Sequence, residues 1–274
     1  MRGHMRRIKL SLCLTLAGLL MLTLIPPAVN AAMFELPVTI KAAFDKMTAA
    51  ADRSTSIKLS NGYSGLLSIQ KQEMEWDEKI NKLHYNNEEK LLAVRQRIKD
   101  LDAAKLIKLE DEIKKTEKKY EQLFSFHSTL TNQLKVAKSA KNKTLTAVFQ
   151  AQVNASKIAV QLAKDDIKMK KTALKEAKSF VTKKTKAIKT TLAEVDKLKV
   201  KIRASKSTVS STNKQFTSET NALKTASRNS DATNSVKSLS RLTGFKEQII
   251  AEKKKMFSYE EQIAAVIVKA NKQF

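Results

Sequence analysis

Clusters of lysine are the residues whose type and spacing indicate chemistry most directly. Lysine is a compact, strongly hydrated charge suited to diffuse attraction of anions, whereas arginine is the better two-point reader of phosphates and bases. The sequence has far more lysine than arginine, which favours bulk binding to a polyanion over sequence-specific recognition of nucleic acid. The clusters are Lys135, Lys138, Lys141 and Lys143; Lys168, Lys170 and Lys171; Lys183, Lys184 and Lys186; and Lys253, Lys254 and Lys255.

The positive charge is unevenly distributed along the chain. The formal net charge is +25, but residues 32–134 contain 17 basic and 16 acidic side chains. Residues 135–274 contain 31 basic and 11 acidic side chains. This half is expected to attract an anionic partner, the alternative being that its charge only keeps the chain soluble.

Other residue patterns give no support for catalysis. Beyond residue 31 the histidines are His84 and His127, and His84 shares one helical face with Glu88. A third metal ligand is not evident, so a metal site there is a weak hypothesis. We find no pattern typical of a Ser-His-Asp or Cys-His site and no glycine-rich phosphate loop. The sequence therefore predicts no enzymatic activity, cofactor or metal.

The first 31 residues resemble a secretory signal peptide. Four basic side chains and no acid occupy the first nine residues, and the uncharged apolar run Leu10–Ile25 follows. Val29 and Ala31 are small enough for signal peptidase, which predicts cleavage between Ala31 and Ala32. The single cysteine, Cys13, would be removed, so the mature chain would form no disulfide.

No second apolar run of membrane-spanning length follows, so no transmembrane span is expected after cleavage. We expect the mature chain to be secreted or associated with the cell envelope, on the extracellular side. Bacterial origin is favoured by the long basic signal and the simple lysine-rich composition.

The elements that must position the lysines are predicted to be helices. The chain has only 5 glycines and 3 prolines, and residues 66–243 contain neither. Two long seams of recurring residues are typical of coiled coils. The first is Leu106, Leu109, Ile113, Thr116, Tyr120, Leu123, His127, Leu130, Leu134 and Ala137. The second is Val160, Ile167, Leu174, Val181, Ile188, Val195, Ile202, Val209, Phe216 and Leu223.

The second seam has weak companion positions, which include Lys170, Lys184 and Glu219. Such a helix suits packing against a longer partner better than a tight independent dimer. The fold class is therefore predicted as all-α, an elongated coiled coil or helical hairpin with short packing helices at its base. A parallel coiled-coil dimer remains the alternative.

The predicted order has four helical parts. A short helix lies within 32–60 and ends at a break over Asn61–Gly65; long helices over 66–138 and 143–228 flank a turn at 139–143. Long helices of this length extend roughly 110 Å. A last amphipathic helix over 236–274 is expected to pack beside the short first helix. Asn229, Asp231 and Asn234 are expected to break the chain before it.

These features favour a structural or binding protein held by charge to an anionic cell-wall polymer or another extracellular polyanion. A secreted helical toxin or adhesin acting on a target-cell membrane is one alternative. A coiled-coil regulator of an extracellular enzyme is another, and a helical protein partner or self-association remains open.

Overall fold

A computed structural model describes residues 34–274, and within them the fold is all-α. Its helices are α1 (Val38–Ala50), α2 (Arg53–Lys99), α3 (Ala103–Ser139), α4 (Lys143–Arg228) and α5 (Ala232–Asn271). The expected signal peptide and its cleavage site at Ala31 and Ala32 lie outside the described residues.

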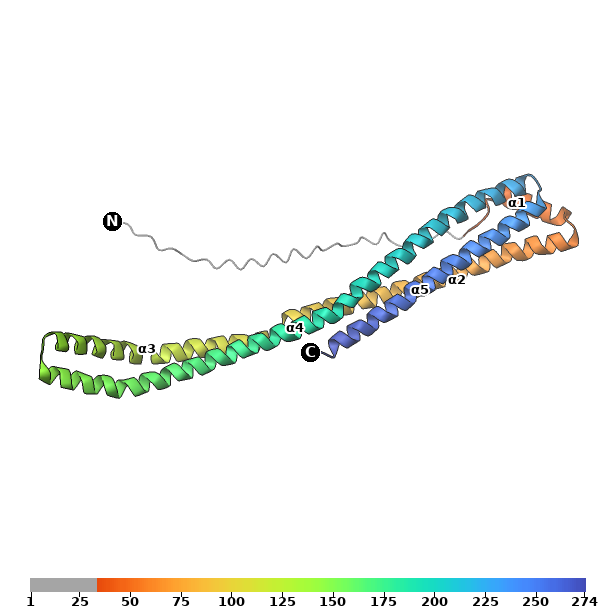
Figure 1. Ribbon diagram of the computed structural model, residues 1–274. Coiled ribbons are helices and arrows are strands. Elements are labelled where there is room, and N and C mark those ends of the chain that lie inside the picture. Colours follow the sequence, from red (N-terminus) through yellow and green to blue (C-terminus); the bar gives the residue numbers. More distant parts are fainter. Residues whose placement is uncertain (1–33) are drawn as a thin grey trace, which may run out of the picture.

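The helices form an elongated hairpin, as predicted (Figure 1). Helices α2 and α3 follow one another in one direction, and α4 returns alongside them (Figure 1). The 86 residues of α4 extend about 130 Å at 1.5 Å per residue. Helix α5 runs back along the end of the hairpin that also holds α1 (Figure 1).

The molecule divides into two regions, which we call the arm and the body. The arm is α3 with α4 up to residue 187. The body is α1, α2, α5 and the remainder of α4. Two buried hydrophobic clusters lie in the body, and neither includes a residue between 99 and 187. The arm instead has the single interface between α3 and α4.

Both sharp turns use residues other than glycine. The tip turn follows α3, where Lys141 has φ 55° and the Asn142 amide donates to the Ala137 carbonyl at 3.1 Å. The turn before α5 repeats this arrangement with Ser230 at φ 55°. These are Schellman-type helix ends, in which the left-handed residue is usually glycine. The turn expected at 139–143 is therefore confirmed.

The break expected at Asn61–Gly65 is wrong, because these residues lie inside α2. Gly62 faces α5: a Cβ there would approach the Leu239 side chain to 3.2 Å. Glycine at this position allows a close approach of two helices and does not interrupt one. The actual break comes at Asp52, whose carboxylate accepts hydrogen bonds from the Ser54 and Thr55 amides and caps α2.

The long helix expected over 66–138 is also interrupted, because α2 ends at Lys99 and α3 begins at Ala103. Asp102 adopts φ 54° at this junction. Aspartate tolerates the left-handed region better than most side chains, so the chain can bend here without glycine or proline. The helix expected over 143–228 is confirmed at both ends.

The last helix begins earlier than expected; its first part packs beside α1, as predicted, but the rest extends farther along the hairpin. Helix α5 starts at Ala232, so Asn234 is already helical, and it packs along α2 and α4 over its length. Its contact with the first helix is confined to its start, where the Ser235 hydroxyl donates to Met47 Sδ at 3.5 Å. A two-helix base would leave apolar faces of α2 and α4 open, and α5 covers them.

Every residue of both predicted seams is buried or half-buried. The lysines at the weak companion positions are half-buried, and their ammonium groups find hydrogen-bond acceptors on neighbouring segments. Lys170 donates to the Thr116 hydroxyl at 2.8 Å, and Lys184 donates to the Phe274 main-chain oxygen.

Candidate functional site

A face of exposed lysines runs along α4 in the arm. Lys157, Lys164, Lys171 and Lys178 lie seven residues apart and form one line along the helix. Lys168 and Lys175 form the adjacent line, one helical turn away. We call these six residues the lysine face. Four of them line a shallow hollow of about 370 Å³ with Ile167 and Thr172; they are Lys164, Lys168, Lys171 and Lys175.

Acidic side chains of α3 neutralise only part of this face. Lys171 lies 2.7 Å from Glu117, and Lys178 lies 2.7 Å from Glu110. The hydrogen bond and charge of Lys178 lower the pKa of Glu110. All four side chains are solvent-exposed, and ion pairs of this kind are weak and screened by salt. Within residues 34–274, the other four lysines of the face form no ion pair.

The predicted lysine clusters do not all lie on the lysine face. Lys168 and Lys171 belong to the lysine face, whereas Lys170 is turned to Thr116 between the helices. Lys183 and Lys186 are exposed farther along α4. The tip lysines Lys135, Lys138, Lys141 and Lys143 are all exposed around the turn, and Lys138 also donates to Gln150 at 3.1 Å.

The cluster expected at Lys253–Lys255 is not a single surface. The Lys253 side chain is 7% exposed and lies between two carboxylates of α2, so it cannot face a polymer. Lys254 lies 5.7 Å from the centre of the Trp76 ring. Lys255 pairs with Glu252 at 2.6 Å, which raises the pKa of Lys255. The structure therefore does not support Lys253 as a residue of the predicted polyanion site.

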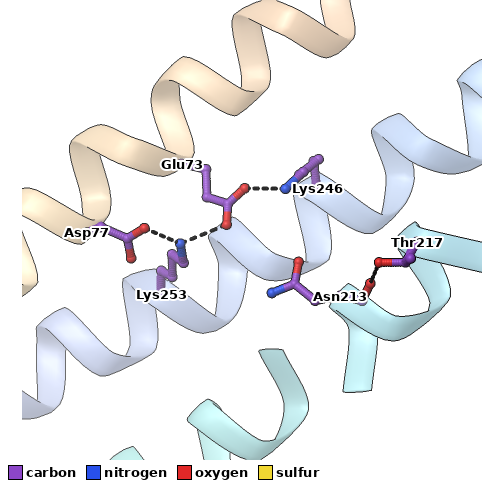
Figure 2. Close-up of polar contacts among 6 residues, drawn as sticks. All are labelled: Glu73, Asp77, Asn213, Thr217, Lys246 and Lys253. Atoms are coloured by element: carbon purple, nitrogen blue, oxygen red, sulfur yellow. Dashed lines mark hydrogen bonds and ion pairs between the residues drawn. The ribbon is translucent and has the colours of Figure 1, made fainter. Parts of the chain in front are cut away.

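Lys253 belongs instead to a buried ion-pair cluster between α2 and α5. Glu73 accepts from Lys246 at 2.6 Å and from Lys253 at 2.8 Å. Lys253 also donates to Asp77 at 2.6 Å, on the half-exposed side of the cluster. Figure 2 shows the two lysines of α5 pointing toward the carboxylates of α2, with Asn213 of α4 nearby.

The electrostatics of the cluster keep Glu73 charged. Burial opposes ionisation and is the largest influence, but the hydrogen bonds and charges of Lys246 and Lys253 together lower the pKa of Glu73. The Lys246 ammonium also lies 4.3 Å from the centre of the Phe216 ring of α4. A buried network with its charges satisfied favours one arrangement of helices over others.

A second buried polar group lies farther along the same interface. The Glu260 carboxylate accepts from Asn87 Nδ2 at 2.8 Å and lies 2.8 Å from His84 Nδ1. Burial raises the pKa of Glu260, but these contacts outweigh it and the net direction is downward. Glu88 pairs with Lys199 of α4 at 2.7 Å, so His84 and Glu88 are committed to different partners. No group of three or more potential metal ligands occurs among residues 34–274.

The polar residues occupy matching seven-residue lines, a signal the sequence analysis missed. On α2 the line is Leu59, Leu66, Glu73, Ile80, Asn87 and Val94, and all are buried. On α5 the line is Leu239, Lys246, Lys253, Glu260 and Ile267, and all are buried. Charged residues at core positions of both lines could have indicated the pairing. Glu73 meets Lys246 and Lys253, and Asn87 meets Glu260, in one register of α2 against α5, and these groups are too enclosed to meet a polymer.

Comparison with protein-family models, curated proteins and solved structures gave no match for this chain. In the region spanning residues 34–274, no helix combines the length and apolar content that membrane crossing requires. The candidate site therefore depends on the geometry of the lysine face alone.

Proposed function

We propose that this protein is exported and held to an anionic polymer of the cell envelope, with the lysine face of the arm as its main contact. The observation that supports this is the four-lysine hollow on α4, where exposed ammonium groups recur every three or four residues. A linear polyanion laid along the arm would meet successive lysines on one side of one helix.

The charge of α4 gives the proposal a physical basis. This helix contains 20 basic and 6 acidic side chains, and α3 contains only 5 acidic side chains to offset them. Binding would release counterions from the polymer, so affinity would fall steeply as salt rises. The screening length shrinks from about 10 Å at 0.1 M to about 3 Å at 1 M salt, which is enough to abolish such attraction.

The test is sedimentation of purified protein beginning at Ala32 with isolated bacterial cell walls. We expect binding at low ionic strength, elution by salt, and much weaker binding to walls stripped of their anionic polymer. Replacing Lys157, Lys164, Lys168 and Lys175 with glutamine should weaken binding without loss of helix, since glutamine is also a good helix former.

The matched control replaces Lys105, Lys108, Lys115 and Lys118 of α3, which are also exposed, with glutamine. Both variants lose four positive charges. A greater loss of binding in the α4 variant would support the lysine face. An equal loss in both variants would mean that binding depends on net charge and not on this face. Binding that does not respond to salt would refute the proposal.

Export can be tested separately. N-terminal sequencing of protein from the culture medium or envelope should begin at Ala32, give or take a residue or two, as the signal pattern predicts. Full-length protein found only in the cytosol would remove the compartment on which the proposed function depends.

A further inference from the structure

The arm has an uncharged zone close to its tip. Residues 122–134 of α3 contain no acidic or basic side chain except His127, and residues 144–156 of α4 contain none at all. The tip turn between the two helices brings these segments close together. In a chain with a net charge of +25, this is the region where a second copy would meet the least repulsion.

Exposed apolar side chains follow one flank of α4 through this zone and continue beyond it. Val148, Ala155, Leu162 and Met169 lie seven residues apart along α4, and the first, third and fourth are 47%, 67% and 65% exposed. These residues are displaced from the lysine lines around the helix. Isolated exposed apolar residues are ordinary, but a continuous line marks an interaction surface.

Helix α3 extends the same flank. Val136 and Gln133 line one shallow hollow of about 390 Å³ together with Leu145 and Phe149 of α4. Phe126, which is 57% exposed, lies seven residues before Gln133 and continues its line. We call the surface formed by Phe126, Val136, Leu145, Val148 and Leu162 the neutral flank.

We propose that the neutral flank is the self-association surface of this protein, which docks a second copy with the two arms antiparallel. An antiparallel overlap of the tips keeps the two basic bodies at opposite ends. A two-fold contact is self-complementary, so each apolar line would cover the partner's.

The charges at the borders of the flank match this arrangement. With the two-fold axis beside Asn154, residue 142 of one copy is level with residue 166 of the other, since both lie twelve positions from the axis. Lys141 and Lys143 of each tip then meet Asp165 and Asp166 of the partner. Side by side in parallel, the same lysines would meet each other. Opposite charges at the borders fix orientation more than affinity.

The experiment is sedimentation equilibrium and small-angle scattering of the protein beginning at Ala32. We expect a dimer, with a maximum dimension well above the roughly 130 Å of α4. The variant Val148→Glu/Leu162→Glu should weaken dimerisation by at least about tenfold, because it places charges in an apolar contact. The control Leu92→Glu/Ile107→Glu adds the same charge at exposed apolar positions off the flank and should dimerise normally.

A charge exchange tests the orientation. Asp165→Lys/Asp166→Lys should weaken the dimer, and adding Lys141→Glu/Lys143→Glu should restore it. A monomer at all concentrations would overturn the proposal, as would equal effects of the flank and control variants. A dimer no longer than one copy would overturn the antiparallel arrangement. A monomer that binds phosphatidylglycerol vesicles through Val148 and Leu162 would assign the flank to lipid instead.

Discussion

The body and the arm are built from the same kind of helix, yet they differ in what they bury. In the body, three long helices share two hydrophobic clusters, and side chains such as Leu223, Leu242 and Ile249 are fully buried. In the arm, α3 and α4 bury one seam between them, and many of its residues, such as Leu174, remain half-buried. A third helix therefore converts a thin interface into a core.

The two regions also use charge differently. The body places Glu73, Lys246 and Lys253 inside, where each needs its partners. The arm places most of its lysines on the surface, although Lys170 lies between the helices and donates to Thr116. The body therefore buries charges in pairs between helices, whereas the arm exposes most of its charges to solvent.

The largest expected effect is on the buried ion-pair cluster. Glu73→Leu leaves Lys246 without an acidic partner in the core and removes one of the two partners of Lys253. Removing one member of a buried pair typically costs about 3–5 kcal/mol of unfolding free energy. Urea unfolding followed by Trp76 fluorescence measures it, because Trp76 packs against Phe257 across the α2–α5 interface.

The matched variant is Glu73→Leu/Lys246→Met/Lys253→Met, which replaces the three buried members of the network with apolar side chains and leaves the half-exposed Asp77 in place. We expect it to recover most of the lost stability, since apolar replacements of buried ion pairs are often neutral or stabilising. If this variant is as unstable as Glu73→Leu alone, volume and packing explain the loss and the charges do not.

The next largest effect is expected from truncation of core side chains, which should cost more stability in the body than in the arm. Leu242→Ala in the body removes a fully buried side chain and should cost about 2–5 kcal/mol. Leu174→Ala in the arm should cost less, because its side chain is half-buried and leaves no closed cavity. Native-state amide exchange should show faster opening of α3 than of α5 in the unmodified protein. Slower exchange in the arm would contradict the comparison.

Acid should weaken the body more than the arm, because Glu73 and Glu260 are buried, whereas Glu110 of the arm, whose pKa is also lowered, is exposed. The pKa values of Glu73 and Glu260 are lowered in the folded protein, so their stabilisation is complete above the usual value of 4.5. It is lost as the pH falls below that value and through the folded pKa values. Trp76 fluorescence should therefore change below about pH 4.5, while α3 stays helical. A variant with Glu73→Gln and Glu260→Gln should lack this pH response, and a response unchanged in that variant would refute the assignment.

The hairpin could be predicted from the sequence because the residues of its interface recur at regular intervals. The seams through Ile113 and Ile188 recur with heptad spacing, and heptads identify buried faces directly. The ends of α4 were also predictable, since residues 139–143 and 229–231 interrupt the pattern.

The wrong predictions concern residues whose type suggests one role and whose tertiary contacts give them another. Gly62 looks like a helix breaker, but its role depends on Leu239, which lies far away in the sequence. Lys253 looks like a surface charge, but Glu73 and Asp77 enclose it. Local composition cannot show which lysine has a buried partner. Charged residues at core positions of two heptad lines could have shown it, because such positions require a complementary charge on the facing helix.

The smallest expected effect concerns the tip of the arm. Lys141 has φ 55°, a conformation that costs a residue with a Cβ roughly 1–2 kcal/mol relative to glycine. Glycine loses more chain entropy on folding, by roughly 0.5–1 kcal/mol, so Lys141→Gly should stabilise the arm by up to about 1.5 kcal/mol. Asp102→Gly is the control at the α2–α3 junction, where aspartate already tolerates φ 54° and a smaller gain is expected. Thermal unfolding with amide exchange at the tip measures both. A loss of stability in Lys141→Gly would mean that contacts of the lysine side chain stabilise the turn more than its backbone conformation destabilises it.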